Sequence, residues 1–301
     1  MEIQRKTTCQ GISLLYAEAK NGSLDATPVL LVHGACGSAQ QMADLMRAVA
    51  TQGHPTYAVE LQRPHDPKSD FLSWFTTTTT SYAEDIAEAT MWIEGQHLRT
   101  PALVGHSQGC YAIWRFLEQC GEDEIPLTIC IAPPPLKGAL IPALKYIARH
   151  PLWFILATLT QNLLWIFGRK KIAMEELFPA GLSLQAAEPL YSELKPEPYG
   201  AFLSMLKPLS GSTIEKIKAA SKKIIFFIGR RDKIFNEETQ QADAQTLRAP
   251  VQYFDATHGM VYTPYAEEVA KSIIERLKIE HAKLVGWPVL GNQPRSATFG
   301  Q

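Results

Sequence analysis

The sequence of 301 residues lacks an excess of either charge. It has 29 lysines and arginines against 30 aspartates and glutamates, a net charge of −1. A chain without a basic excess has no general electrostatic attraction to nucleic acid, so we predict no nucleic-acid partner. Hydrophobic residues make up 46% of the chain, which excludes a largely disordered protein.

Paired cysteines and a secretory leader are also missing. The five cysteines are scattered without a Cys-x-x-Cys spacing, and a chain of this length does not depend on a disulfide scaffold. We interpret them as reduced thiols. The first ten residues carry Glu2, Arg5 and Lys6 and have no apolar run of the kind found in signal peptides, so we expect a cytoplasmic location.

The common cofactor-binding motifs are absent as well. The sequence contains neither G-x-x-x-x-G-K-[ST] nor G-x-G-x-x-G, the glycine-rich loops that hold nucleotide phosphates. His54, His65, His97, His150 and His281 form no pair at the i, i+4 spacing of a helical metal site. We therefore predict no cofactor and no metal.

What the sequence does contain is an alternation of short apolar runs with segments of helical periodicity. This alternation is typical of an α/β fold, a mostly parallel sheet covered by helices on both faces. We expect an eight-stranded sheet. The apolar runs predict strands or hairpin arms at residues 10–20, 29–32, 56–60, 102–104, 127–131, 224–228 and 251–254.

Helix signals lie between these runs. Apolar residues at helical spacing predict a helix from Met42 to Gly53. Capping pairs predict two more, one at Ser81 and Glu84 and one at Ser212 and Glu215. Further helices are expected directly after Ser107, ending near Gly121, and from Pro264 onward.

The alternation stops between Pro133 and Ser210, where no strand is predicted. Residues 140–148 and 152–167 have the length and bulk of helices. We predict an α/β core formed by residues 1–132 and 211–280, a helical cap formed by residues 133–210, and a loose tail at residues 281–301. Residues 63–69 and the threonine run 76–80 are interpreted as surface loops.

The sharpest chemical signal is the pentapeptide GHSQG at residues 105–109. It follows an apolar strand and precedes a helix, the context in which G-x-S-x-G forms a strained turn that exposes a serine hydroxyl. Side chains in place of the flanking glycines would collide with the neighbouring strand and helix. Ser107 is therefore a candidate nucleophile.

A serine hydroxyl needs a base beside it and an acid that orients the base. Asp232 follows the strand at 224–228, and His258 follows the strand at 251–254. The carboxyl ends of parallel strands meet at one edge of a sheet, so these side chains are expected to converge with Ser107. Asp255 is a rival acid, but it lies only three residues before His258 on the same loop.

The segment HGACGS at residues 33–38 directly follows the strand at 29–32. Acyl transfer places negative charge on a carbonyl oxygen, and fixed backbone N–H groups stabilise that charge. We expect the N–H groups of Ala35 and Gln108 to form this oxyanion hole. Gly34 and Gly37 would let the backbone turn inward, although a plain glycine-rich turn is the alternative.

Taken together, these four segments resemble the α/β-hydrolase fold serine hydrolases. The matching segments are HGACGS as oxyanion loop, GHSQG as nucleophile elbow, GRRD at 229–232 as acid loop and THG at 257–259 as histidine loop. The resemblance covers about residues 9–277 and is esterase-like or lipase-like. It implies a triad of Ser107, His258 and Asp232, and the serine disfavours members with an aspartate nucleophile.

We expect the residues of the predicted cap to determine which substrate is accepted, because the catalytic segments are common to many activities. Twelve of the sixteen residues 152–167 are apolar, but the run is shorter than the roughly 20 residues that span a bilayer. We weigh a buried cap helix, a helix lining an acyl pocket, and a helix with weak membrane-surface contact, since cations flank it. His33, Gly34, Cys36 and Met260 are further pocket candidates.

The predicted activity is hydrolysis of a carboxylic ester with a hydrophobic acyl group, a small-molecule substrate. Two alternatives stay open. One is a thioesterase or acyltransferase that uses the same triad. The other is a ligand receptor that keeps the fold without catalysis, because fold alone does not determine function.

Overall fold

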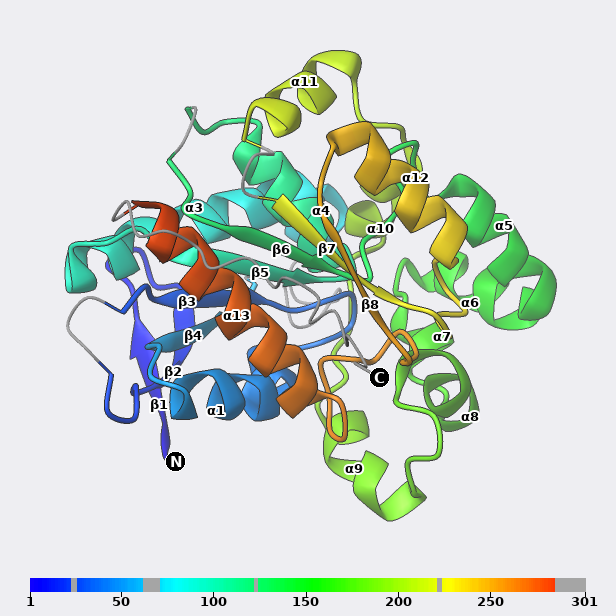
Figure 1. Ribbon diagram of the computed structural model, residues 1–301. Helices are drawn as coiled ribbons and strands as arrows, with labels where there is room; N and C mark the ends of the chain where they lie inside the picture. The colour runs from blue at the N-terminus through cyan, green and yellow to red at the C-terminus, as the bar shows by residue number, and fades with distance from the viewer. Residues whose placement is uncertain (23–25, 62–70, 122–123, 221–223, 285–301) are drawn as a thin grey trace, which may run out of the picture.

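The computed structural model describes residues 1–22, 26–61, 71–121, 124–220 and 224–284 (Figure 1). Within these residues the strands form one eight-stranded sheet in the order β1-β2-β4-β3-β5-β6-β7-β8. Strands β3 to β8 run parallel, and β1 and β2 form an antiparallel hairpin at one edge. The predicted α/β class with a mostly parallel eight-stranded sheet is confirmed. The strands are β1 Ile3–Thr7, β2 Ser13–Ala17, β3 Val29–Val32, β4 Thr56–Val59, β5 Ala102–His106, β6 Thr128–Ile131, β7 Ile224–Gly229 and β8 Val251–Phe254.

The central strands are the ones that sequence predicts well. All residues of β3, β5 and β7 are buried, and strands buried on both faces read as continuous apolar runs. Strand β1 was not predicted. Its sequence IQRKT is polar and largely exposed because it lies at the sheet edge, paired only to β2.

Helices cover both faces of the sheet (Figure 1). Helices α1 and α13 pack against each other on one face, and α3 and α4 pack together on the other. The buried side chains form one apolar cluster on each face. The helices of the core are η1 Ala39–Met42, α1 Ala43–Thr51, α2 Phe71–Thr76, α3 Thr79–His97, α4 Gln108–Leu117, α11 Gly211–Ala220, α12 Glu237–Leu247 and α13 Ala266–Leu284.

The threonine run 76–80 is not the surface loop that we predicted. Thr78 is the N-cap of α3: its side chain accepts a hydrogen bond from the N–H of Thr80, and Ser81 caps Thr78 in return. Thr77 and Thr79 are buried. The helix therefore begins before the predicted Ser81–Glu84 pair. Residues 63–69 and 285–301 lie outside the described residues. Residues 281–284, the first four of the predicted loose tail, instead continue helix α13.

The segment between β6 and β7 is helical, and we call residues 133–210 the cap segment. The predicted helical stretch 152–167 is interrupted at Gln161, which has a left-handed backbone (φ +54°). Asn162 then accepts a hydrogen bond from the N–H of Leu164 and starts a new helix. The helices of the cap segment are α5 Leu140–Arg149, α6 Pro151–Thr160, α7 Leu164–Phe167, α8 Lys170–Ile172, η2 Ala173–Leu177, α9 Leu184–Ser192 and α10 Tyr199–Leu206.

A buried carboxyl group on α12 holds the beginning of the cap segment. Asp243 is 5% exposed, and its Oδ2 accepts a hydrogen bond of 2.9 Å from the N–H of Leu136. Burial raises the pKa of Asp243 to about 6, although the Leu136 N–H and the nearby Lys137 oppose the shift. This hydrogen bond joins α12 to the chain that leaves β6.

Asp243 makes stability depend on pH. The pKa of about 6 in the folded protein lies above the ordinary value of 3.8, so the stability that the protonated group contributes is full below pH 3.8. That stability is lost as the pH rises through 6. Asp243→Asn does not titrate, so wild type should lose roughly 2–3 kcal/mol of unfolding free energy relative to the variant between pH 4 and pH 8.

Urea denaturation of both proteins at several pH values measures this difference. The control is Glu238→Gln, a substitution of an exposed residue on the same helix. Its free energy of unfolding should differ little from that of wild type at each pH. A wild-type minus Asp243→Asn difference that stays constant with pH would contradict the prediction.

Candidate functional site

Ser107 lies on a sharp turn between β5 and α4. Its backbone has φ +52° and ψ −124°, a conformation that a residue with a side chain rarely adopts. The strain presents the hydroxyl group at the carboxyl end of the sheet. Ser107 lines a cavity there, together with Gly34, Ala35 and His258.

The glycines around Ser107 are required by close contacts. A Cβ on Gly105 would lie 2.8 Å from the N atom of Cys110, and one on Gly109 would collide with the carbonyl oxygens of Val32 and His33. The expected reason for these glycines is thus confirmed. Helix α4 can rest on the end of β3 only because residue 109 has no side chain.

His258 and Asp232 form a buried pair. The Nδ1 of His258 lies 2.9 Å from Oδ2 of Asp232, and the two side chains are 2% and 0% exposed. The other carboxylate oxygen, Oδ1, accepts hydrogen bonds from the N–H groups of Ile234 (2.8 Å) and Phe235 (3.1 Å). Since the carboxylate only accepts, Nδ1 carries the proton, and Nε2 is left as the acceptor nitrogen.

The rival acid is placed elsewhere. The side chain of Asp255 is 82% exposed and forms an ion pair of 2.9 Å with Arg231. It is therefore engaged at the surface, whereas Asp232 is the carboxylate that contacts the His258 ring.

His106 connects the turn at Ser107 to the loop that carries His258. Its Nε2 donates a hydrogen bond of 2.8 Å to the carbonyl oxygen of His258, and the two rings lie 5.0 Å apart. Burial, reinforced by the neighbouring His258, lowers the pKa of His106 to about 3. The ring is therefore uncharged at neutral pH and acts as a fixed donor.

The loop 33–38 takes a shape that the sequence did not indicate. Its left-handed residue is Cys36, with φ +55°, and not one of the glycines. Gly34 is needed for space, because a Cβ there would lie 3.1 Å from the Cβ of Ser107. Ala35 lies between these two positions, beside Ser107 in the cavity wall.

Cys36 is held by the cap segment. Its N–H donates to Oε2 of Glu197 (3.1 Å), and its carbonyl oxygen accepts from the N–H of Lys195 (2.9 Å). Glu197 is fully buried and also accepts a hydrogen bond of 2.8 Å from the hydroxyl group of Tyr82 on α3. No sequence pattern singled out Glu197, which lies between two prolines.

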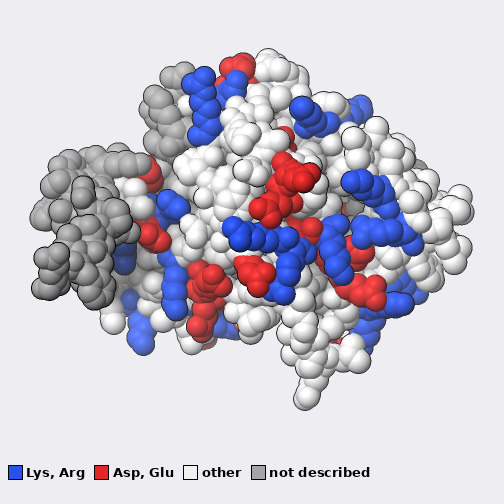
Figure 2. Space-filling model, turned by 45° about the vertical axis from the view of Figure 1, so that its right-hand side comes forward, with Lys and Arg blue, Asp and Glu red and all other residues white. Residues whose placement is uncertain are grey.

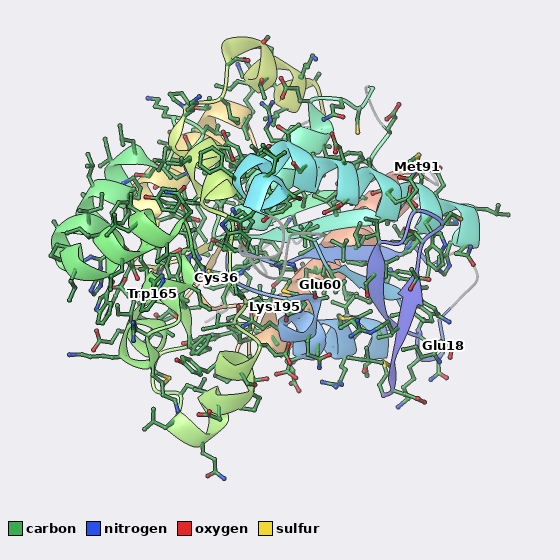
Figure 3. All side chains as sticks on the ribbon, turned by 180° about the vertical axis from the view of Figure 1, so that it is seen from behind. Glu18, Cys36, Glu60, Met91, Trp165 and Lys195 are labelled. Carbon is green, nitrogen blue, oxygen red and sulfur yellow. The ribbon has the colours of Figure 1, made fainter. Side chains whose placement is uncertain are left out.

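A second contact between the cap segment and the core lies beside the hydrogen bonds of Cys36. Lys195 forms an ion pair of 3.1 Å with Glu60, and Glu60 accepts a hydrogen bond of 2.9 Å from the N–H of Ala39. Figure 3 shows Glu60 and Lys195 side by side, with Cys36 nearby. Burial alone would raise the pKa of Glu60, but His33, the Ala39 N–H and Lys195 together lower it.

The histidine loop also packs against the cap segment. A Cβ on Gly259 would collide with the carbonyl oxygen of Leu177, and the hydroxyl group of Thr257 donates to the carbonyl oxygen of Phe178 (3.2 Å). The loop before His258 and the end of η2 are thus in direct contact.

The cavity beside Ser107 is mainly apolar. None of the described residues recorded in its wall is Asp, Glu, Lys or Arg. Its polar members are Gln41, His106, Ser107, Tyr146, His258 and Tyr262. Its large apolar members come mostly from the cap segment and include Phe154, Ile166, Phe167, Leu177, Phe178 and Phe202.

Three of the four predicted pocket residues do not line this cavity. Gly34 does, but His33, Cys36 and Met260 do not. The ring of His33 instead contacts the carbonyl oxygen of Gly34 and the N–H of Leu61. Cys36 packs among buried residues of the cap segment, and Met260 lies in the apolar cluster beneath the sheet. Sequence proximity to the catalytic motifs was a poor guide to side-chain direction.

Gln108 is the first residue of α4 and is 1% exposed. A backbone N–H in the first turn of a helix has no partner within that helix, which is the property the oxyanion prediction needs. The described residues contain no group of three His, Cys, Asp or Glu side chains that could hold a metal ion. In the same part of the chain, no helix is long and apolar enough to cross a membrane.

Residues 29–272 match the model of the alpha/beta hydrolase family. The chain belongs to the alpha/beta hydrolase family. The match includes all four segments that carried the predicted resemblance. No curated protein matches the sequence.

Solved structures of the same fold differ in the activity that they are named for. An esterase from Rhodococcus sp. ECU1013 has 16% identity and a TM-score of 0.59, covering 92% of this chain and 99% of its own. A thioesterase domain from the curacin biosynthetic pathway has 17% identity and a TM-score of 0.59, over 91% and 99%. A bromoperoxidase from Bacillus anthracis has 16% identity and a TM-score of 0.64, over 92% and 100%. At such identities the likeness shows the fold alone.

Removal of the Glu197 carboxylate should destabilise the protein. Glu197→Ala leaves the Cys36 N–H and the Tyr82 hydroxyl group without this acceptor, and each buried donor left unsatisfied costs about 1–3 kcal/mol. We expect a loss of roughly 2–4 kcal/mol in the free energy of unfolding. Glu197→Gln, which keeps one acceptor oxygen, should lose less.

Urea denaturation measures both losses. The control is Glu175→Ala, an exposed glutamate of the same cap segment, which should change stability by no more than about 0.5 kcal/mol. Equal stability of Glu197→Ala and the control would show that the buried contacts contribute nothing.

Proposed function

We propose that the chain is a serine hydrolase that cleaves a carboxylic ester with a hydrophobic acyl group. The observation that carries the proposal is the shared cavity of Ser107 and His258, with the His258 ring held by Asp232 from behind. A serine on a strained turn, a buried imidazole and a buried acid are the parts that nucleophilic acyl transfer requires.

In the first half of the reaction, the Ser107 oxygen attacks the ester carbonyl carbon, and its proton moves to Nε2 of His258. The resulting imidazolium is stabilised by Asp232. The negative carbonyl oxygen is bound by the N–H groups of Ala35 and Gln108. His258 then gives the proton to the leaving alkoxide, the bond to the alcohol breaks, and the acyl group stays on Ser107.

In the second half, water replaces the alcohol. His258 removes a proton from the water molecule as its oxygen attacks the acyl carbon. The new tetrahedral intermediate collapses, the proton returns to the oxygen of Ser107, and the carboxylic acid is released. Atoms and charges balance over the cycle, and no cofactor takes part.

The cavity wall supports an uncharged, apolar acyl group. A charged acyl chain would lose its hydration without gaining a charged partner from the described residues of the wall, which is costly. Rings of Phe154, Phe167 and Phe202 offer apolar surface instead, and each CH₂ group buried there contributes about 0.8 kcal/mol.

The nucleophile is tested without guessing the substrate. A fluorophosphonate reacts with a serine that already lies beside its base and oxyanion donors, so intact-mass analysis should show one adduct on wild type. Ser107→Ala should show none. The control Ser192→Ala, an exposed serine in α9, should label like wild type. Labelling of Ser107→Ala would exclude Ser107 as the nucleophile.

Asp232→Asn tests whether His258 is the base, because the substitution changes which ring nitrogen of His258 carries the proton. The amide oxygen would keep the hydrogen bonds from Ile234 and Phe235, so the NH₂ group would face His258. The ring must then accept at Nδ1 and carry its proton on Nε2, where it cannot receive the Ser107 proton. We expect kcat to fall roughly 10³–10⁴-fold, with the melting temperature as the check on folding. Near-normal kcat would exclude Asp232 from this role.

One acyl group offered as its ester and as its thioester separates the first alternative. A higher kcat/KM on the ester supports the proposal, and a preference for the thioester favours a thioesterase. Transfer of the acyl group to an added alcohol rather than to water favours an acyltransferase. Binding of fatty acyl ligands without turnover, unchanged in Ser107→Ala, would favour a non-catalytic receptor.

A further inference from the structure

Helices α5 and α6 expose large aliphatic side chains to solvent. Leucine and isoleucine residues recur at helical spacing on the outer face of each helix, and all are more than half exposed. They are Leu140 (51%), Ile141 (66%) and Leu144 (54%) on α5, and Leu152 (59%), Ile155 (56%) and Leu159 (76%) on α6. We call these six residues the outer apolar face. A concentration of this kind on a monomer marks an interaction surface.

The inner faces of the same two helices are already used. Pro142, Ala143 and Tyr146 of α5 and Phe154 of α6 line the cavity beside Ser107. The two helices are also in contact with each other. Because their inner faces line the cavity, the outer apolar face is separated from the cavity by the thickness of one helix. Its side chains are therefore not needed to close the core.

The sequence that carries this face is basic. Between Ile125 and Met174 the sequence has six lysines and arginines and no aspartate or glutamate, in a chain whose net charge is −1. Lys145 and Lys171 are exposed. Two of the six cations, Arg149 and Lys170, are paired with glutamates that follow later in the cap segment, Glu176 and Glu188. The right-hand part of Figure 2, the side on which α5 and α6 lie in Figure 1, carries blue side chains with some red ones among them, next to a white surface without charged residues.

Aromatic and cationic side chains meet at the border of the face. The guanidinium group of Arg169 lies 3.9 Å from the ring centre of Trp153 and 5.0 Å from that of Trp165. Trp165 is 37% exposed. Tryptophan beside a cation is the combination found where proteins meet the headgroup layer of a membrane.

We propose that the outer apolar face docks on an anionic membrane surface. The aliphatic side chains would enter the boundary between headgroups and acyl chains, and the surrounding cations would contact the anionic headgroups. A second copy of this chain is a poorer occupant, because two such surfaces would bring like charges together. In this orientation α5 and α6 lie between the membrane and the cavity, whose wall they form with Pro142, Ala143, Tyr146 and Phe154.

Vesicle flotation tests the proposal without requiring catalysis. Wild type should bind vesicles of phosphatidylcholine mixed with phosphatidylglycerol, bind pure phosphatidylcholine vesicles more weakly, and lose binding as salt rises. Leu144→Ser with Ile155→Ser should reduce partitioning roughly a hundredfold. Lys145→Gln with Lys171→Gln should reduce it roughly thirtyfold on the mixed vesicles only.

The matched control is Met91→Ser. Met91 is 61% exposed on α3, and Figure 3 places it on the opposite side of the molecule from Trp165. This variant should bind like wild type, and so should Ser107→Ala. Because Ser107→Ala is tested for binding alone, failure of the proposed hydrolase activity and failure of membrane docking are separate results. Unchanged melting temperatures show that the substituted proteins are folded.

Three outcomes overturn the proposal. The first is that wild type floats with neither kind of vesicle. The second is that the variant carrying both Leu144→Ser and Ile155→Ser binds the vesicles like wild type. The third is a dimer of wild type that this variant converts to a monomer in sedimentation velocity, without vesicle binding, because the face would then join two copies.

Discussion

The site depends on how closely one helix approaches one strand. The carbonyl oxygens of Val32 and His33 occupy the space that a side chain at Gly109 would fill. The first turn of α4 therefore rests on the end of β3, and the loop that follows β3 lies directly beside Ser107. The close approach of Gly34 to Ser107 depends on this short distance between backbones.

Three buried carboxyl groups near that edge of the sheet hold loops by the same kind of hydrogen bond. Each accepts a hydrogen bond from the backbone N–H of a loop: Asp232 from Ile234 and Phe235, Glu197 from Cys36, and Asp243 from Leu136. Loops cannot satisfy all their N–H groups internally, and a buried N–H without an acceptor is costly. The acidic side chains thus fix loops at this edge of the sheet, and of these three Asp232 is the one that also contacts the proposed base.

Sequence predicted the parts of the fold that short-range patterns specify. The boundaries of β3 and β8 agree with the apolar runs, and Ser107, His258 and Asp232 follow strands whose carboxyl ends converge. Strand β1 was missed because an exposed edge strand needs few apolar residues. Helix α12 was missed because its sequence has little apolar periodicity. The break at Gln161 was missed although the run 152–167 is polar at residues 160–162, because the apolar residues on both sides favoured one continuous helix.

The rest of the site comes from contacts between distant segments. Glu197 holds Cys36 across 161 residues of sequence, and no spacing rule connects them. The direction of a side chain on a loop is likewise set by what surrounds it, which is why Cys36 and Met260 point away from the cavity. Such features require the packed structure, because they depend on which loops meet and not on the residues within one loop.

The attachment of the cap segment has a mechanical consequence. Besides the contact of Asp243 at its beginning, the segment is fastened to the core at its later part, through Glu197 and Lys195 on the loop 33–38 and through Leu177 and Phe178 on the loop of His258. A rigid swing of the whole segment would pull both loops out of position at once. A movement that leaves both loops in place would have to displace α5 and α6 and leave the later half of the segment where it is.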